Sequence, residues 1–151
     1  MEITRTFDLL ERYQALYNRD GVLNAKEKGK WVGYSATEYI DFSHDFARGL
    51  LALGFEKGDK IATISNNRPE WNFMDMGMSM IGVVHVPIFS SMGDADYEYI
   101  LNHSDAKMVI VNDRKHSNKV QPALEKLDAL KKCYTIDIVE GLSNWMEIVD
   151  E

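Results

Sequence analysis

One short segment of the sequence concentrates positive charge, with Arg114, Lys115, His116 and Lys119 close together. It follows an apolar run at 107–111 and precedes a helical pattern, so we expect a loop at the carboxyl end of a strand, beside a helix N-terminus. Cations and backbone N–H groups placed there can hold a phosphate group. The alternative is a solvated loop, which the sequence favours because charge runs usually lie on exposed faces.

A second candidate place is the pair Ser90 and Ser91, directly after the apolar run at 83–89. If that run is a strand of a parallel sheet, the pair lies at its carboxyl end, where open α/β sheets gather their ligands. The alternative is a strand exit that leads into the next helix, since serine is common in turns and caps. The sequence favours this structural alternative.

No stretch rich in Ser, Thr and Gly and ending in Lys occurs in the 151 residues. The segment most similar to a phosphate loop, at 90–94, has Asp94 where a phosphate loop needs a lysine. The glycines at 54–58 precede a strand, whereas a dinucleotide fingerprint follows one. His85 stands alone in an apolar run and is expected to be a hydrogen-bonded core histidine, while Arg68 is expected to pair with an acid such as Glu70 or Asp94. We therefore predict no catalytic residue and no metal ligand in this sequence.

Composition narrows the class of protein. With 24 acidic and 17 basic residues the net charge is −7, which disfavours nucleic acid as a partner. A chain of this length fits one domain with a real core. The single cysteine, Cys133, is expected to be a buried thiol in a reducing cytoplasm, and no apolar run is long enough to span a membrane. A soluble, cytoplasmic protein without a transmembrane segment is the expectation.

The first 34 residues predict a helix followed by a β-hairpin. Thr6 is the expected N-cap of the helix, which Asn18 and Gly21 should end. The hairpin spans 22–34, with Gly29 supplying a positive φ angle in its charged turn.

Residues 35–151 alternate between helical and strand patterns. The first helix, at 36–53, has the clearest start, because Ser35 and Glu38 form a capping box. The helix that carries Pro69 in its first turn is apolar around nearly its whole circumference and is expected to be buried on several sides. The remaining elements are strands at 60–65, 83–89, 107–111 and 134–138 and helices at 94–104 and 119–130, the last with Pro122 in its first turn. This order predicts an α/β layered fold with a mostly parallel sheet of about four strands flanked by helices.

Three segments within residues 58–113 are similar in sequence to a known family: GDKIATISNNRPEWN, IGVVHVPIF and DYEYILNHSDAKMVIV. With them the chain resembles the N-terminal part of the adenylate-forming (AMP-binding) acyl-CoA synthetases, and most of all the long-chain fatty-acid–CoA ligases. The resemblance covers essentially this whole chain but a minor part of such an enzyme. It implies that residues 1–151 are one incomplete N-terminal piece of a larger adenylation domain, with helix and hairpin at 1–34 and alternating elements at 35–151.

The resemblance implies an enzyme that uses ATP, Mg²⁺ and CoA to adenylate a fatty acid and then form a thioester. The 151 residues alone are expected to be inactive and to bind none of these cofactors tightly. In relatives the loop matching Ser90 and Ser91 lies beside the pantetheine channel. Arginines of acetyl-type relatives contact the CoA nucleotide at the positions of His116 and Lys119. The CoA-side candidates are therefore Ser90, Ser91, Arg114, Lys115, His116 and Lys119.

The expected partners are the remainder of the adenylation domain, the C-terminal domain of the same enzyme and a second copy in a homodimer. Two alternatives stay open: a stand-alone binding or oligomerisation module without activity, and an adenylate-forming ligase for a different carboxylate. If the chain is a fragment, it should expose an apolar patch or an unpaired strand edge and self-associate through it.

Overall fold

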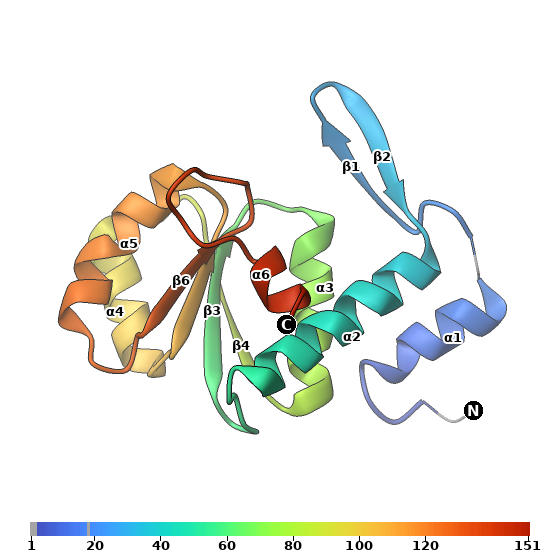
Figure 1. Cartoon of the computed structure of the whole chain (residues 1–151), viewed down its shortest axis with the longest axis horizontal. Coiled ribbons are helices and arrows are strands. Elements are labelled where there is room, and N and C mark those ends of the chain that lie inside the picture. Colours follow the sequence, from blue (N-terminus) through green and yellow to red (C-terminus); the bar gives the residue numbers. More distant parts are fainter. Residues whose placement is uncertain (1–2, 18) are drawn as a thin grey trace.

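The computed structural model describes residues 3–17 and 19–151. An N-terminal helix and a two-stranded hairpin precede an alternation of helices and parallel strands, which confirms the predicted α/β class (Figure 1). The elements in chain order are α1 (Asp8–Leu16), β1 (Leu23–Glu27), β2 (Lys30–Tyr34), α2 (Ala36–Ala52), β3 (Lys60–Ser65), α3 (Pro69–Ile81), β4 (Val84–Phe89), α4 (Asp94–Ser104), β5 (Met108–Val111), α5 (Arg114–Lys126), β6 (Lys132–Thr135) and α6 (Met146–Val149).

The main sheet has the strand order β4-β3-β5-β6, and every neighbouring pair is parallel. The α4 and α5 helices cover one face, while α2, α3 and α6 lie on the other (Figure 1). Successive side chains of a strand point to opposite faces, so β3 sends Ile61 toward α2 and α3 but Ala62 and Ile64 toward α4 and α5. The sheet therefore separates two hydrophobic cores.

The α3 helix is enclosed as its sequence predicts, since every one of its residues is buried or half-buried. Phe73, Met74 and Met78 are fully buried in the core beneath α2, and Met76 and Met80 pack against that core. These methionines therefore serve as core packing.

Several local signals act as predicted. The Ser35 hydroxyl accepts from the backbone N–H of Glu38, and the Glu38 carboxylate accepts from that of Ser35, which completes the capping box of α2. Pro69 is the first residue of α3, where its missing N–H costs nothing. Gly29 has φ of 84° in the turn between β1 and β2.

The start of α1 differs from the prediction, because Phe7 rather than Thr6 occupies the N-cap position and no side chain caps the helix. The Asp8 carboxylate instead turns back and accepts from the backbone N–H groups of Thr4 and Arg5, at 3.1 and 2.9 Å. Asn18, one of the two residues expected to end this helix, lies outside the described residues.

The strand predicted at 83–89 begins one residue later, at Val84, and is partly exposed. It is β4, an edge of the sheet, and Val84 and Phe89 are exposed. Pro87 lies within β4 rather than at its end, which an edge strand tolerates because the missing N–H can face away from the sheet. Local sequence patterns do not distinguish an edge strand from a central one here, since both are apolar.

The fifth helix begins five residues earlier than the expected 119 and ends at Lys126 rather than 130. The Asp113 carboxylate caps it by accepting from the His116 backbone N–H at 3.0 Å, and Pro122 lies inside the helix instead of in its first turn. The last strand is also displaced, because β6 ends at Thr135 and Ile138 beyond it is 93% exposed. Positions 114–119 are thus helical and not a loop.

The exposed edge of β4 bears out the expectation of apolar surface on a free strand edge. Its residues Val84 and Phe89 face solvent, whereas the edge of β6 is partly covered by residues 143–145, which bond to Thr135. Self-association through β4 stays a prediction.

None of the helices in the described part of the chain has the length and apolar content that crossing a bilayer requires. Cys133 lies half-buried on β6, and burial raises the pKa of its thiol to about 11, as expected for an unreactive side chain.

Candidate functional site

The carboxyl ends of the four parallel strands gather polar side chains at one edge of the sheet, the carboxyl edge. The segments that follow the strands begin at Asn66, Ser90, Asn112 and Ile136. Parallel strands bring these segments together although they are far apart in the sequence. The hairpin of β1 and β2 projects beside the same edge (Figure 1).

The two segments singled out in the sequence meet here. The Nε2 atom of His116 lies 3.1 Å from the backbone oxygen of Ser90, and the Lys119 ammonium donates to the backbone oxygen of Met92 at 3.2 Å. The Tyr97 hydroxyl also donates to the Ser90 oxygen, at 2.8 Å. The first two turns of α5 therefore hold the loop at 90–93.

His116 bridges the cap of α5 and the loop at 90–93. Its Nδ1 atom lies 2.8 Å from a carboxylate oxygen of Asp113, and its Nε2 atom faces the Ser90 carbonyl. Burial acts to raise the pKa of the Asp113 carboxyl, but hydrogen bonds from the His116 backbone and ring outweigh it and lower that pKa.

The other predicted residues are spread around this contact. Ser91 and Lys115 are exposed, and neither side chain has a hydrogen bond or ion pair within the described residues. Arg114 turns away and donates to the backbone oxygen of Glu140. The ammonium of Lys119 lies 3.7 Å from a carboxylate oxygen of Asp94. The structure thus joins Ser90, His116 and Lys119 but does not focus all the cations on one point.

A network of hydrogen bonds centred on Arg68 joins the ends of three strands. The sequence predicts only its contact with Glu70. The guanidinium makes a two-pronged contact with Glu70, at 2.9 and 2.7 Å, which confirms Glu70 as a partner and leaves out Asp94. It also donates to Asp137 at 2.8 Å and to the Asn112 amide oxygen at 3.3 Å.

The environment of Arg68 fixes its charge. Burial acts to lower the pKa of its guanidinium, and the carboxylates of Glu70 and Asp137 outweigh that effect, so the pKa is raised. The sequence does contain one signal for the position of Arg68, the run of polar residues that follows β3. It lies at the carboxyl end of a strand, where ligands bind in open α/β sheets. No pattern in the sequence indicates that Asp137, near the other end of the chain, pairs with Arg68.

A cavity of about 420 Å³ lies between the hairpin and the carboxyl edge. Its lining includes Trp31 from the hairpin and Asn67, Arg68, Asn112 and Asp137 from the edge. A second hollow of about 300 Å³ adjoins it between Asn66 and Trp71. Neither is lined by any of the six predicted site residues, so these two cavities are separate from the contact between Ser90 and His116.

His85 has partners as a core histidine should. Its Nδ1 atom lies 2.7 Å from Asp75 and its Nε2 atom 2.7 Å from the Thr63 hydroxyl, with the Trp71 ring packed against it. The order hydroxyl, imidazole, carboxylate is that of a nucleophile with its base. However, Thr63 is only 1% exposed and lies in the centre of the sheet, so no substrate can reach it. The arrangement ties β3, β4 and α3 together, and the predicted structural role is confirmed.

The donors needed for a nucleotide and its metal ion are not assembled in this part of the protein. Across residues 3–17 and 19–151 no three His, Cys, Asp or Glu side chains cluster as metal ligands. The carboxyl edge offers amides, the half-buried and already paired guanidinium of Arg68, and exposed cations. This chemistry fits contacts to a polar ligand and does not fit activation of a phosphate.

Comparison with known proteins shows the family to which this chain belongs. A family model described as AMP-binding enzyme matches residues 11–150. Long-chain-fatty-acid--CoA ligase ACSBG1 of Rattus norvegicus is 29% identical over 121 residues, which cover 79% of this chain and 17% of that protein. Acyl-CoA ligase SID4 of Ajellomyces capsulatus is 31% identical over 144 residues, which cover 94% of this chain and 23% of that protein. The chain therefore spans well under a third of these relatives.

The fold recurs in solved structures. Coronafacic Acid Ligase from Pectobacterium brasiliense superposes with a TM-score of 0.84 at 21% identity, over 98% of this chain and 30% of that chain. Likeness at this level of identity shows a shared fold, including the parallel sheet with helices on both faces.

Proposed function

Since the chain belongs to the AMP-binding enzyme family, we propose that it is the N-terminal segment of an ATP-dependent acyl-CoA ligase for long-chain fatty acids. In the proposed reaction a fatty-acid carboxylate oxygen attacks the α-phosphorus of ATP and pyrophosphate leaves. The CoA sulfur then attacks the acyl carbon of the adenylate, and AMP leaves. The match to the family model over residues 11–150 is the observation that carries this proposal.

The long-chain substrate rests on the ACSBG1 relative, which is named for it, together with the phrases of residues 58–113 that resemble such ligases. The partners proposed are the remainder of the adenylation domain and the C-terminal domain of the same enzyme. ATP and Mg²⁺ would be held by residues of those parts, because this chain lacks a phosphate loop and a cluster of metal ligands among its described residues. No chemical step is assigned to a residue of this chain.

We propose that this chain contributes to the reaction by forming part of the surface that contacts CoA. Ser90 and Ser91 lie on a loop that α5 holds through His116 and Lys119, and the exposed Lys115 precedes His116 in the first turn of α5. An anionic ligand passing over this loop would meet Lys115 first, because Arg114 and Lys119 are already engaged with backbone oxygens. The six residues thus divide into a supporting pair, His116 and Lys119, the half-buried Ser90, and three exposed residues, Ser91, Arg114 and Lys115.

The ligase assignment is tested by comparing two proteins: the 151-residue chain and a longer protein that contains it together with the following sequence of its gene. We expect the longer protein to release pyrophosphate and form acyl-CoA when given ATP, Mg²⁺, CoA and a long-chain fatty acid, and the 151-residue chain to form none. Acids of other lengths and aromatic acids in the same assay identify the substrate. Absence of acyl-CoA with every carboxylate, from a folded longer protein, would refute the assignment.

The CoA-side role predicts a selective effect of Lys115→Glu in that longer protein. Lys115 is exposed and has no partner within the described residues, so its reversal leaves the loop at 90–93 in place. We expect the KM for CoA to rise by about threefold to fivefold, since one exposed charge contact is worth up to about 1 kcal/mol. The kcat and the KM for ATP should stay unchanged. Lys28→Glu, on the hairpin turn, is the control, and equal KM values for CoA in the two variants would remove Lys115 from the CoA side.

A further inference from the structure

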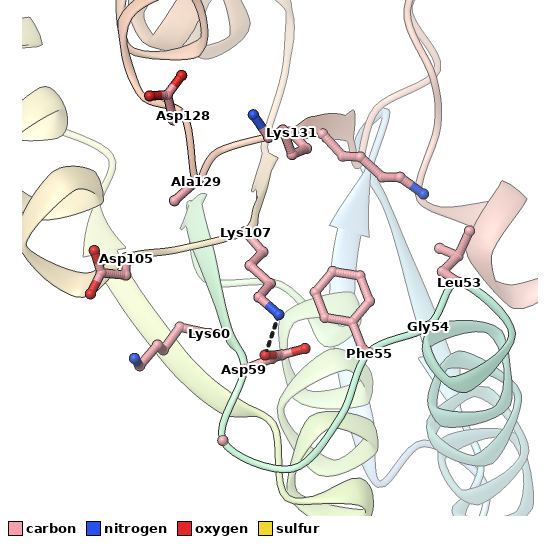
Figure 2. A pocket seen from close by; sticks show the side chains of 12 residues that line it. Leu53, Gly54, Phe55, Asp59, Lys60, Asp105, Lys107, Asp128, Ala129 and Lys131 are labelled. Carbon is pink, nitrogen blue, oxygen red and sulfur yellow. Dashed lines mark ion pairs between the residues drawn. The ribbon is translucent and has the colours of Figure 1, made fainter.

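A pocket of about 550 Å³ opens at the amino edge of the sheet, opposite the edge described above. It lies between the end of α2, the starts of β3, β5 and β6, and the connection from α5 to β6 (Figure 2). Its size suits a small organic molecule rather than a macromolecule. The lining residues are Leu53, Gly54, Phe55, Gly58, Asp59, Lys60, Asp105, Lys107, Asp128, Ala129, Lys131 and Lys132.

The charge of the pocket is opposite to that of the protein. Four lysines and three aspartates line it, so the pocket carries a single excess positive charge in a chain of net charge −7. Lys107 is paired with Asp59 at 2.6 Å. The ammonium groups of Lys60, Lys131 and Lys132 have no ion pair or hydrogen bond within the described residues. The pocket therefore has amines available for an anion.

The rest of the lining is apolar. Figure 2 shows Leu53 and Phe55 on one side of the pocket and the carboxylates of Asp105 and Asp128 on the other, with the Lys107 side chain between them. The aliphatic stems of the lysines add carbon surface to that of the two apolar residues. A ligand that fills this space needs an apolar body as well as an anionic group.

The aspartates of the pocket limit the negative charge that a bound anion can carry. One excess charge balances a monoanion, whereas a phosphate ester or a CoA thioester would bring additional negative charge toward Asp105 and Asp128. We propose that the pocket binds a medium-chain monocarboxylate, with its alkyl tail against Leu53 and Phe55 and its carboxylate at one of the unpaired amines that line the pocket. The site is independent of the proposed ligase activity, because every residue that forms it lies in this chain.

The test uses octanoate and the ¹⁵N-labelled 151-residue chain, with no ATP or CoA present. We expect saturable shifts of amide signals at 53–60 and 128–132. Octanol, which lacks the charge, and octyl phosphate and octanoyl-CoA, which carry more of it, should each bind at least about fivefold more weakly than octanoate. Tighter or equal binding of any of these three would overturn the assignment to a monocarboxylate.

A matched pair of variants locates the site. Ala129→Asp places a carboxylate on an exposed lining residue and cancels the excess charge, so the Kd for octanoate should rise at least about fivefold. Ala95→Asp makes the same change at an exposed position of α4, away from the pocket, and should leave the Kd unchanged. Lys131→Gln combined with Lys132→Gln should weaken binding as Ala129→Asp does. Lack of saturation, shifts confined to other residues, or equal Kd values for the two aspartate variants would each refute the proposal.

Discussion

Gly77→Ala is expected to lower the free energy of unfolding by about 2 kcal/mol, although alanine is the better helix former by about 1 kcal/mol. Gly77 lies in the middle of α3, where this helix crosses α2. A Cβ atom at this position would lie 2.7 Å from the backbone oxygen of Ser43 and 3.0 Å from the Phe46 ring. Either the helices separate or the new methyl group overlaps its neighbours.

Steric overlap outweighs helix propensity here because the first atom contacted belongs to a backbone. Overpacking of a core costs about 1–3 kcal/mol, and the upper end applies where neighbours cannot turn aside. Both helices are fixed by the core around Phe46, Phe73 and Met78, which are fully buried. Subtracting the gain of about 1 kcal/mol from propensity leaves a net loss of about 2 kcal/mol.

Urea denaturation of the 151-residue chain, followed by circular dichroism, measures this effect. Asp41→Ala is the control, because it introduces alanine at an exposed position of α2 and should change stability by no more than about 0.5 kcal/mol. A Gly77→Ala protein as stable as the wild type would show that α2 and α3 do not approach as closely as described.

Arg68→Ala should destabilise the protein by about 2–3 kcal/mol. The Arg68 and Glu70 side chains are only 21% and 12% exposed, so removal of the guanidinium leaves the Glu70 carboxylate mostly buried without a counter-ion. Breaking a fully buried pair costs about 3–5 kcal/mol, and partial exposure of this one reduces the expected value. Loss of the contacts to Asp137 and Asn112 also disconnects three strand ends at the carboxyl edge.

The matched control for Arg68→Ala is Arg48→Ala. Arg48 pairs with Asp45 on the surface of α2, and both side chains are exposed, so its loss should cost no more than about 0.5 kcal/mol. Arg68→Lys keeps the charge but loses the two-pronged geometry, and should fall between the two in the same urea experiment. Equal stability of the two alanine variants would mean that the Arg68 network contributes no more than an ordinary surface pair.

The elements best predicted from the sequence are those with complete local signals. Ser35 with Glu38 fixed the start of α2, and Pro69 fixed that of α3, because capping depends on residues within one turn. The apolar circumference of α3 correctly indicated burial on several sides. The start of α5 was predicted wrongly, since Pro122 was taken as a first-turn residue while Asp113 provides the cap.

The site was predictable only in part. The sequence placed Ser90 and His116 each at the carboxyl end of a strand, and the parallel sheet does bring them to 3.1 Å, as measured from the Ser90 oxygen to Nε2. It did not indicate that Arg68 would also reach Asp137, which follows it by 69 residues. Contacts of that range depend on the order of strands in the sheet, which no local pattern encodes.

The sequence by itself determined the class of fold, the family and the absence of a phosphate loop, because periodicity, caps and motifs are properties of neighbouring residues. Tertiary structure decided which strand is the edge, which cations stay exposed and which acid completes the Arg68 network. It also created the pocket at the amino edge, where lysines at or next to the starts of β3, β5 and β6 line one space together with Phe55. These features depend on strand order and helix crossing, and both result from the packing of the whole chain rather than from any one segment.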